Sequence, residues 1–267
     1  MVRNIDELLT MKSGLGVIRD GAVGIHAGRV AWVGPTAKAP SADRVLSGRG
    51  CIGLPGLVDC HTHSLFAGSR AEEFEARLAG ADYSAILEAG GGILSTVRAT
   101  REASDEELRS SLRRRLDGML RGGVTTVEVK TGYALSIEQE LRCLQLLGES
   151  WPTRVLRTFL GAHTVPAEWR PDRSGYARHV VEQMLPRVAE HAEMVDVYCD
   201  RGAFTLDEAR AILQAGQALG LGGRVHAEQV EHTGAAAMAA GLGCWSADHL
   251  ERLDDEGVAA LASADIV

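Results

Sequence analysis

The chain changes its pattern of apolar and polar residues after Pro55-Gly56. Before this point, apolar and polar positions alternate around two hairpin-like pairs, Asp20-Gly21 and Ala27-Gly28, as is typical of short strands joined by tight turns. After it, short β-rich runs alternate with longer helical patterns. The sequence therefore predicts two domains, a small β domain over residues 1–54 and an α/β domain over residues 55–267.

The second domain contains runs with the length and composition of buried strands. These runs lie at 56–63, 124–133, 154–163, 194–202, 223–229 and 244–250. Helical patterns separate them, and two of these open with a capping box, Ser104 with Glu107 and Thr205 with Glu208. Strands buried on both faces that alternate with helices form parallel βαβ units. Six strands and the opening of a seventh at 264–267 predict an incomplete (β/α)8 TIM barrel, with a doubly wound sheet as the alternative.

The charged residues of the chain indicate which kind of molecule it binds. The chain has 28 basic and 36 acidic residues and a formal net charge of −8, which favours a small-molecule substrate over nucleic acid or an anionic membrane. The basic stretch at 109–121 keeps its leucines at helical spacing and is typical of a helix with a solvated charged face.

Three further features of the sequence indicate where in the cell the protein is found. The N-terminus lacks the composition of a secretory signal, and no apolar run approaches the ~18 residues of a membrane span. The five cysteines are scattered and form no C-x-x-C pair, as is typical of reduced thiols. We therefore expect a cytoplasmic protein.

Histidines end four of the six predicted strands. His61 and His63 are one residue apart, so they point to the same face of their strand and can bind one cation at ~2.0–2.1 Å per nitrogen. Taken alone, this pair is equally consistent with two hydrogen-bonded polar residues at a strand end. His226 is the candidate third ligand, while His163 and His249 are candidates for substrate binding or proton transfer. The alternative for each of these three is a structural bond to a backbone carbonyl.

Several motifs then carry a family resemblance. PGLVDCHTH (55–63) resembles the first metal-binding strand of the amidohydrolase superfamily. The stretches FAGSRAEEFEARLAGADYSAILEAGGGILSTVRATREAS, GVTTVEVKTGYAL, RTFLGAH, HAEQ and SADHLE, in this order, resemble the imidazolonepropionase family over residues 55–267. The resemblance implies a metal-dependent-hydrolase TIM barrel, a small β-sandwich domain begun by residues 1–54, one zinc or iron ion, and a homodimer. It also implies hydrolysis of 4-imidazolone-5-propanoate to N-formimidoyl-L-glutamate in histidine degradation.

The same motifs imply a role for individual residues. His61, His63 and His226 match the metal ligands, and His249 matches the catalytic histidine, our candidate general base. The positions that match substrate contacts are Arg70, Tyr83, Tyr133, His163 and Gln229. We expect Arg70 to hold the propanoate carboxylate, because a guanidinium binds a carboxylate through two parallel hydrogen bonds. The alternative for Arg70 is a surface ion pair with Glu72 or Glu73.

Two departures from the family pattern leave alternatives open. The fourth ligand of the family, an aspartate on the eighth barrel strand, has no counterpart here, so an inactive fragment is one alternative. Another cyclic-amide hydrolase or a deaminase of the same superfamily is the other. The run at 194–202 contains no lysine, which argues against a two-metal site bridged by a modified lysine there. For Glu128 and Lys130, a buried ion pair is preferred over catalysis.

Overall fold

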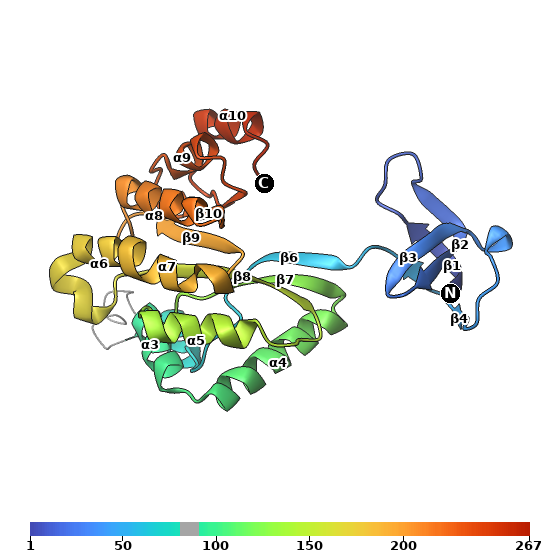
Figure 1. Ribbon diagram of the computed structural model, residues 1–267, viewed down its shortest axis with the longest axis horizontal. Helices are drawn as coiled ribbons and strands as arrows, with labels where there is room; N and C mark the ends of the chain where they lie inside the picture. The colour runs from blue at the N-terminus through green and yellow to red at the C-terminus, as the bar shows by residue number, and fades with distance from the viewer. Residues whose placement is uncertain (81–90) are drawn as a thin grey trace. The chain divides into compact units, whose positions relative to one another are not determined.

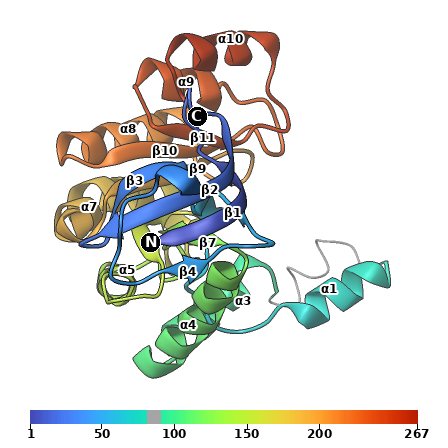
Figure 2. The same ribbon diagram turned by 90° about the vertical axis from the view of Figure 1, so that its right-hand side faces the viewer.

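The computed structural model describes residues 1–80 and 91–267. The chain divides into two compact units, Met1–Leu57 and Val58–Val267, and each is described by itself (Figures 1 and 2).

The first unit is a small β-sheet with the strand order β3-β2-β1-β4. The strands are β1 (Val2–Leu9), β2 (Val17–His26), β3 (Arg29–Pro35), β4 (Leu46–Ser47) and β5 (Ile52–Gly53), which also pairs with β1. The expected turn at Ala27-Gly28 joins β2 to β3, and both residues have positive φ, 48° and 73°. The expected turn at Asp20-Gly21 is wrong. β2 continues through it, because pairing with β1 on both sides of Asp20 satisfies the backbone better than a local turn does.

The second unit is built on a curved sheet whose strand order is β11-β10-β9-β8-β7-β6. The strands are β6 (Leu57–Thr62), β7 (Val124–Lys130), β8 (Arg154–Ala162), β9 (Met194–Cys199), β10 (Gly222–Ala227) and β11 (Ser246–His249). Each pair of neighbouring strands from β7 through β11 is parallel. These strands coincide with the six runs predicted from sequence, and their order is that of six consecutive strands of a (β/α)8 barrel.

Most of the helices lie on the outer side of this sheet, whereas the first of them projects away from it in Figure 2 (Figures 1 and 2). The helices are α1 (Ala71–Leu78), α3 (Ile93–Glu102), α4 (Asp105–Arg121), α5 (Ile137–Leu147), α6 (Arg173–His179), α7 (Leu185–Val188), α8 (Leu206–Ala218), α9 (Ala235–Gly241) and α10 (Asp255–Ser263). Both predicted capping boxes are present, at the starts of α4 and α8. The leucines of α4 at positions 108, 112 and 116 are fully buried and pack in one core cluster with Val127 and Val129 of β7.

The sheet curves until its two edge strands face each other across the interior. His61 of β6 contacts Asp248 of β11, and Arg224 of β10 donates a hydrogen bond to the carbonyl of Cys60 at 2.8 Å. The strand predicted at 264–267 is limited to Val267, whose backbone exchanges hydrogen bonds with Trp245 and Ala247 along the outer edge of β11. The structure therefore confirms an incomplete barrel and rules out the flat doubly wound alternative.

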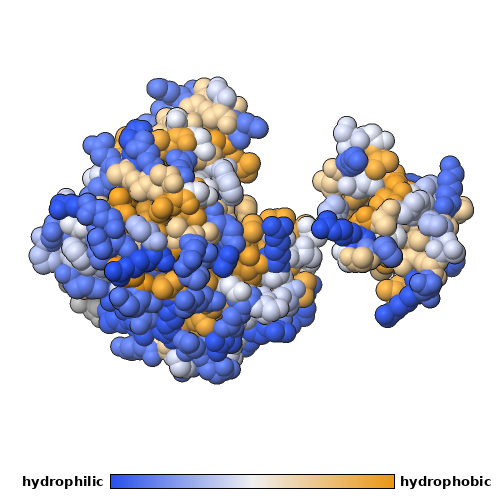
Figure 3. Space-filling view, viewed as in Figure 1, coloured by the Kyte–Doolittle hydropathy of each residue, from blue (hydrophilic) through white to orange (hydrophobic). Residues whose placement is uncertain are grey.

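Exposed apolar side chains lie on or next to both edge strands of the sheet. Val58 on β6 and Trp245, which precedes β11, are more than half exposed. Figure 3 shows patches of apolar residues among hydrophilic ones on the surface of the second unit. Within residues 1–80 and 91–267, none of the helices combines the length and the apolar character that a membrane span requires.

Candidate functional site

The predicted site histidines meet at the carboxyl ends of the parallel strands. His61 and His63 come from the end of β6, His163 follows β8, His226 is on β10, and His249 ends β11. The ring centroid of His61 lies 4.6 Å from that of His226 and 5.3 Å from that of His249. The ring of His163 stacks on that of His63 at 4.8 Å. Five side chains that are far apart in sequence thus form one cluster, at the end of the barrel where sites are built.

Three of these imidazoles can share one cation. A ring nitrogen from each of His61, His63 and His226 lies within 4.8 Å of the other two, and the two Nε2 atoms of His63 and His226 are 3.3 Å apart. Burial and the neighbouring imidazoles of His163 and His226 lower the pKa of His63 well below its usual value. His63 is therefore neutral, which is the form of imidazole that binds metal.

Two carboxylates orient these imidazoles from the far side. Asp248 lies 2.9 Å from Nδ1 of His61, and Asp196 lies 3.1 Å from Nδ1 of His226. A carboxylate that accepts the Nδ1–H fixes the tautomer and leaves the Nε2 lone pair for a metal ion. Within the described residues, Nδ1 of His63 is buried without a hydrogen-bond partner. Three imidazole nitrogens with this support fit a zinc or iron ion.

A buried ion network lies beneath the histidines. Lys130 contacts Glu128, as the sequence predicted, and also Asp196 and Asp248. Although burial opposes its charge, the carboxylates of Asp196 and Glu128 raise the pKa of Lys130. The contacts with His226 and Lys130 in turn hold the pKa of Asp196 well below its usual range against the effect of burial. Lys130 and Asp196 are therefore both charged at neutral pH.

His249 sits on a strained backbone at the rim of the cluster. Its φ is 78° and that of Leu250 is 69°, a left-handed conformation that is uncommon for residues other than glycine. This turn is fixed by the hydrogen bond from Leu250 N to the carbonyl of Ala227. Burial and the imidazoles of His226 and His61 lower the pKa of His249, so that its ring is neutral at pH 7.

Two of the predicted substrate residues, Arg70 and Tyr133, lie together beside the histidine cluster. Tyr133 lies 5.2 Å from His163 between ring centroids, and burial raises the pKa of its hydroxyl. Arg70 and Tyr133 line one small cavity of about 210 Å³ together with Phe66 and Thr96. Arg70 Nε donates to Glu73 at 2.7 Å, so the ion pair considered as its alternative does form. Tyr83 lies outside the described residues.

His163 has a defined tautomer. Its Nδ1 lies 3.1 Å from the carbonyl oxygen of Gly132, which can only accept a hydrogen bond. The Nδ1 therefore carries the proton, and Nε2 is left as an acceptor. Burial and the nearby His226 lower the pKa of His163 to about 3, so this neutral tautomer persists through the physiological range.

Buried carboxylates also hold two of the loops that carry substrate residues. Asp200, at the end of β9, accepts hydrogen bonds from the backbone N–H groups of residues 229, 230 and 231 and so fixes the loop of Gln229. Glu140, on α5, accepts from the N–H groups of residues 132, 134 and 135 and fixes the loop of Tyr133. Sequence reasoning assigned no role to these two residues or to Asp196 and Asp248, because each partner is remote in sequence or is a backbone group.

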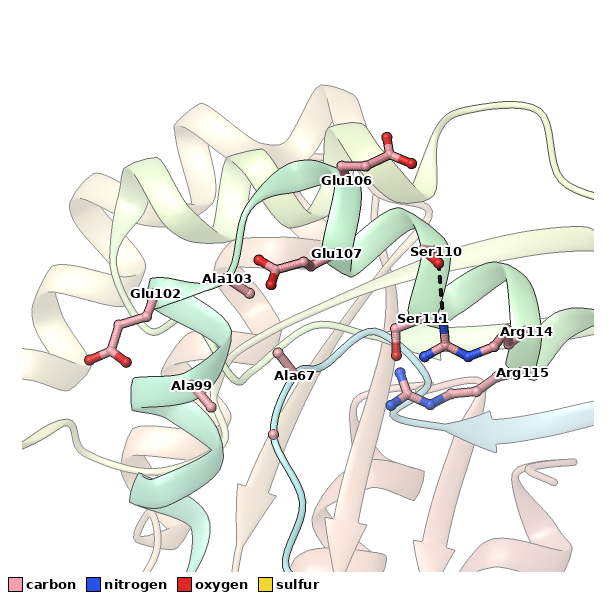
Figure 4. A pocket seen from close by; sticks show the side chains of 11 residues that line it. Ala67, Ala99, Glu102, Ala103, Glu106, Glu107, Ser110, Ser111, Arg114 and Arg115 are labelled. Atoms are coloured by element: carbon pink, nitrogen blue, oxygen red, sulfur yellow. Dashed lines mark hydrogen bonds between the residues drawn. The ribbon is translucent and has the colours of Figure 1, made fainter.

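A surface groove lies apart from this cluster. It measures about 770 Å³ and runs between the loop after β6 and helices α3 and α4 (Figure 4). Its lining includes Ala67, Ala99, Glu107, Ser111 and Arg115, and none of the predicted site residues. Figure 4 also shows Arg114 donating to Ser110 along α4. The groove therefore offers helix-surface groups and none of the converging imidazoles.

The chain is similar in sequence to curated proteins over most of its length. No family model matches the chain. It is 46% identical to the imidazolonepropionase of Geobacillus kaustophilus over 267 residues, which cover 96% of this chain and 63% of the relative. It is 43% identical to that of Geobacillus sp. strain WCH70, covering 100% and 68%, and 48% identical to that of Methylobacterium sp. strain 4-46, covering 95% and 65%. The chain thus spans about two thirds of the length of these curated relatives.

Solved structures with low sequence identity have the same fold. Guanine deaminase from C. acetobutylicum with bound guanine superposes with a TM-score of 0.65 at 11% identity, covering 99% of this chain and 65% of that one. Atrazine chlorohydrolase from Arthrobacter aurescens TC1 in complex with zinc has a TM-score of 0.62 at 17% identity, covering 100% and 64%. At these identities the matches establish a shared fold and nothing about substrate.

Proposed function

Because the chain belongs to the imidazolonepropionase family of amidohydrolases, we propose that it hydrolyses the ring amide of 4-imidazolone-5-propanoate to N-formimidoyl-L-glutamate, a step of L-histidine degradation. The observation that carries the proposal is the convergence of the imidazoles of His61, His63 and His226 beside His249 at one end of the barrel. The identity of 43–48% to relatives of that name supports the choice of substrate.

His61, His63 and His226 would hold one zinc or iron ion. When bound, such an ion supplies Lewis acidity and lowers the pKa of a coordinated water towards ~7, which provides hydroxide at neutral pH. The chain's part is to aim the three imidazoles at one point. Asp248 and Asp196 do this for His61 and His226 by accepting their Nδ1–H groups.

We assign proton transfer to His249. Its lowered pKa keeps the ring neutral at pH 7, so Nε2 can accept a proton from the attacking water. The same nitrogen then returns the proton to the departing ring nitrogen of the substrate. Nδ1 faces Glu251 at 3.6 Å, an orientation that leaves Nε2 for this role.

The propanoate end of the substrate needs a local cation in a chain of net negative charge. Arg70 and Tyr133 share one cavity beside the histidine cluster, and we assign the carboxylate to them. Arg70 donates to Glu73 through Nε. The two terminal nitrogens of its guanidinium therefore remain to bind the propanoate carboxylate through two parallel hydrogen bonds. His163, through Nε2, and Gln229 orient the ring, and Tyr83 remains part of this assignment from the sequence motif.

An activity panel tests the substrate. The purified chain, loaded with Zn²⁺ or Fe²⁺, is incubated with 4-imidazolone-5-propanoate, a hydantoin and an aminopurine, and products are followed by chromatography. We expect N-formimidoyl-L-glutamate as the product, and none from a His61→Asn/His63→Asn variant. Turnover of only the hydantoin or only the aminopurine would show that the proposed substrate is wrong and that the other compound class is the substrate. A folded, metal-loaded chain that turns over none of the three would favour the catalytically silent alternative.

The proposal has further parts that concern the whole protein. These are a cytoplasmic location, a homodimer, the absence of a nucleic-acid or membrane partner, and a division into functional domains at residues 1–54 and 55–267. The net charge of −8 supports the choice of a small-molecule partner. Sedimentation velocity tests the dimer, and a single monomeric species at micromolar concentration would contradict it.

A further inference from the structure

One lysine stands among three carboxylates directly below the histidine cluster. Lys130 Nζ lies 2.7 Å from Asp196 Oδ2, 2.8 Å from Glu128 Oε1 and 3.4 Å from Asp248 Oδ2. Its side chain is completely buried. The ammonium is thus surrounded by three carboxylate oxygens. A bound metal cation has similar surroundings.

The same carboxylates form part of a second set of metal-ligating groups. Ligand atoms of Asp196, His226 and Asp248 all lie within 4.8 Å of one another. This set shares His226 with the set formed by His61 and His63, so an ion in each would give a two-metal site. The ammonium of Lys130 touches both carboxylates of the second set.

The charges of this network favour the same interpretation. Lys130 and Arg224 oppose the carboxylates of Glu128, Asp196 and Asp248, and Arg224 reaches Asp248 at 3.1 Å and Glu128 at 3.6 Å. Without Lys130, three buried carboxylates would face the single charge of Arg224. The deficit of two positive charges is what one divalent cation supplies, and buried charges must be paired.

We propose that Lys130 is a positioning residue that takes the place of a second metal ion. It closes Asp196 and Asp248 to a second cation and, through them, holds the imidazoles of His226 and His61 towards the first. The network pairs the ammonium form of Lys130, because a carbamate there would add a further negative charge to three carboxylate oxygens. The inference rests on the proposed function only in that the three histidines bind a metal ion.

Metal stoichiometry tests this role. The full chain is stripped with a chelator, dialysed against Zn²⁺, and its zinc content is measured by mass spectrometry. We expect one equivalent per chain for the wild type and two for Lys130→Met, which removes the charge at similar length. Lys130→Arg keeps the charge and should stay at one equivalent. Lys38→Met, at an exposed lysine of the first unit, is the matched control and should also stay at one.

Each outcome decides the proposal. A folded Lys130→Met chain that binds one equivalent with wild-type affinity overturns it, as does a Lys130→Arg chain that binds two. If Lys130→Met does not fold without metal, recovery of a cooperative melt with two equivalents of Zn²⁺ supports the proposal. Failure to recover with excess Zn²⁺ overturns it. Because the readout is stoichiometry, a wild type that binds one ion without hydrolysing imidazolone propanoate contradicts the proposed function alone.

Discussion

His61 and Asp248 are 187 positions apart in sequence, yet Nδ1 of the histidine lies 2.9 Å from Oδ2 of the aspartate. The two residues belong to β6 and β11, the opposite edges of the six-stranded sheet, so their contact spans the interior of the curved barrel. The same contact fixes the tautomer of a candidate metal ligand. The same interaction therefore joins the two edges of the fold and orients a side chain of the site.

Asp248→Asn should weaken metal binding. The substitution removes the charge that stabilises the Nδ1–H of His61, and loss of such a supporting carboxylate typically costs about 10–100-fold in metal affinity. Competition with a chromophoric zinc chelator measures the change. Asp117→Asn, at a surface ion pair of α4, is the matched control and should leave the affinity unchanged. Equal affinities for the two folded variants would contradict the assignment of Asp248.

His163 should make the apo protein less stable in acid. Its folded pKa of about 3 lies below the 6.5 of the unfolded chain, so between these values the unfolded state binds more protons. The free energy of unfolding therefore falls as pH decreases from 6.5 towards 3, by at most about 1.4 kcal/mol per pH unit. His163→Asn keeps a donor for the carbonyl of Gly132 but does not titrate. The free energy of unfolding of this variant should therefore depend less on pH between 6.5 and 3.

Urea unfolding of the chelator-treated chain at about pH 7 and about pH 5 measures this effect. The loss of stability between the two should be smaller in His163→Asn by up to about 2 kcal/mol. His26→Asn, at an exposed residue of the first unit, is the control. An identical loss in wild type and His163→Asn would show that His163 does not titrate in this way.

Local sequence patterns predicted the features that depend on local geometry. The spacing of His61 and His63 placed both on one face because side chains alternate along a strand, and the capping box at Ser104 is present. Asp196 and Asp248 were missed because an aspartate inside an apolar strand carries no signal of its own until the barrel brings its histidine alongside. The turn expected at Asp20-Gly21 failed for the same reason, since ladder pairing across β1 decided the local conformation.

Asp200→Asn should impair substrate binding more than metal binding. The carboxylate of Asp200 accepts three consecutive backbone N–H groups at the start of the Gln229 loop, and an amide side chain offers a single acceptor oxygen. We expect KM for imidazolone propanoate to rise about 10-fold, the equivalent of one charged hydrogen bond, with zinc content unchanged. Asp207→Asn, at an exposed position in the first turn of α8, is the control. An unchanged KM for a folded Asp200→Asn chain would show that Asp200 does not support substrate binding through the Gln229 loop.

Arg70→Lys should raise KM with little effect on metal content. A lysine keeps the charge beside Tyr133 but cannot form two parallel hydrogen bonds with a carboxylate. We expect KM for imidazolone propanoate to rise about 10-fold, a modest change because the Arg70 side chain is 45% exposed. Arg113→Lys, at a surface pair of α4, provides the control. If Arg70→Lys left KM unaltered, the cavity of Arg70 would not be the propanoate site.

Gly132→Ala should disrupt the site through a steric clash. Gly132 has a φ of 101°, and a Cβ atom there would meet the carbonyl oxygen of Leu160 at 2.7 Å and Cβ of His163 at 3.0 Å. Gly220, with a φ of 87°, has similar backbone strain but no atom within 4 Å of such a Cβ. Gly220→Ala therefore measures the backbone cost alone, about 1–2 kcal/mol. Gly132→Ala should lose more stability in urea unfolding and, unlike Gly220→Ala, most of its kcat/KM, because His163 must move. Equal losses of stability with full activity in both variants would show that the loop of Gly132 yields without displacing His163.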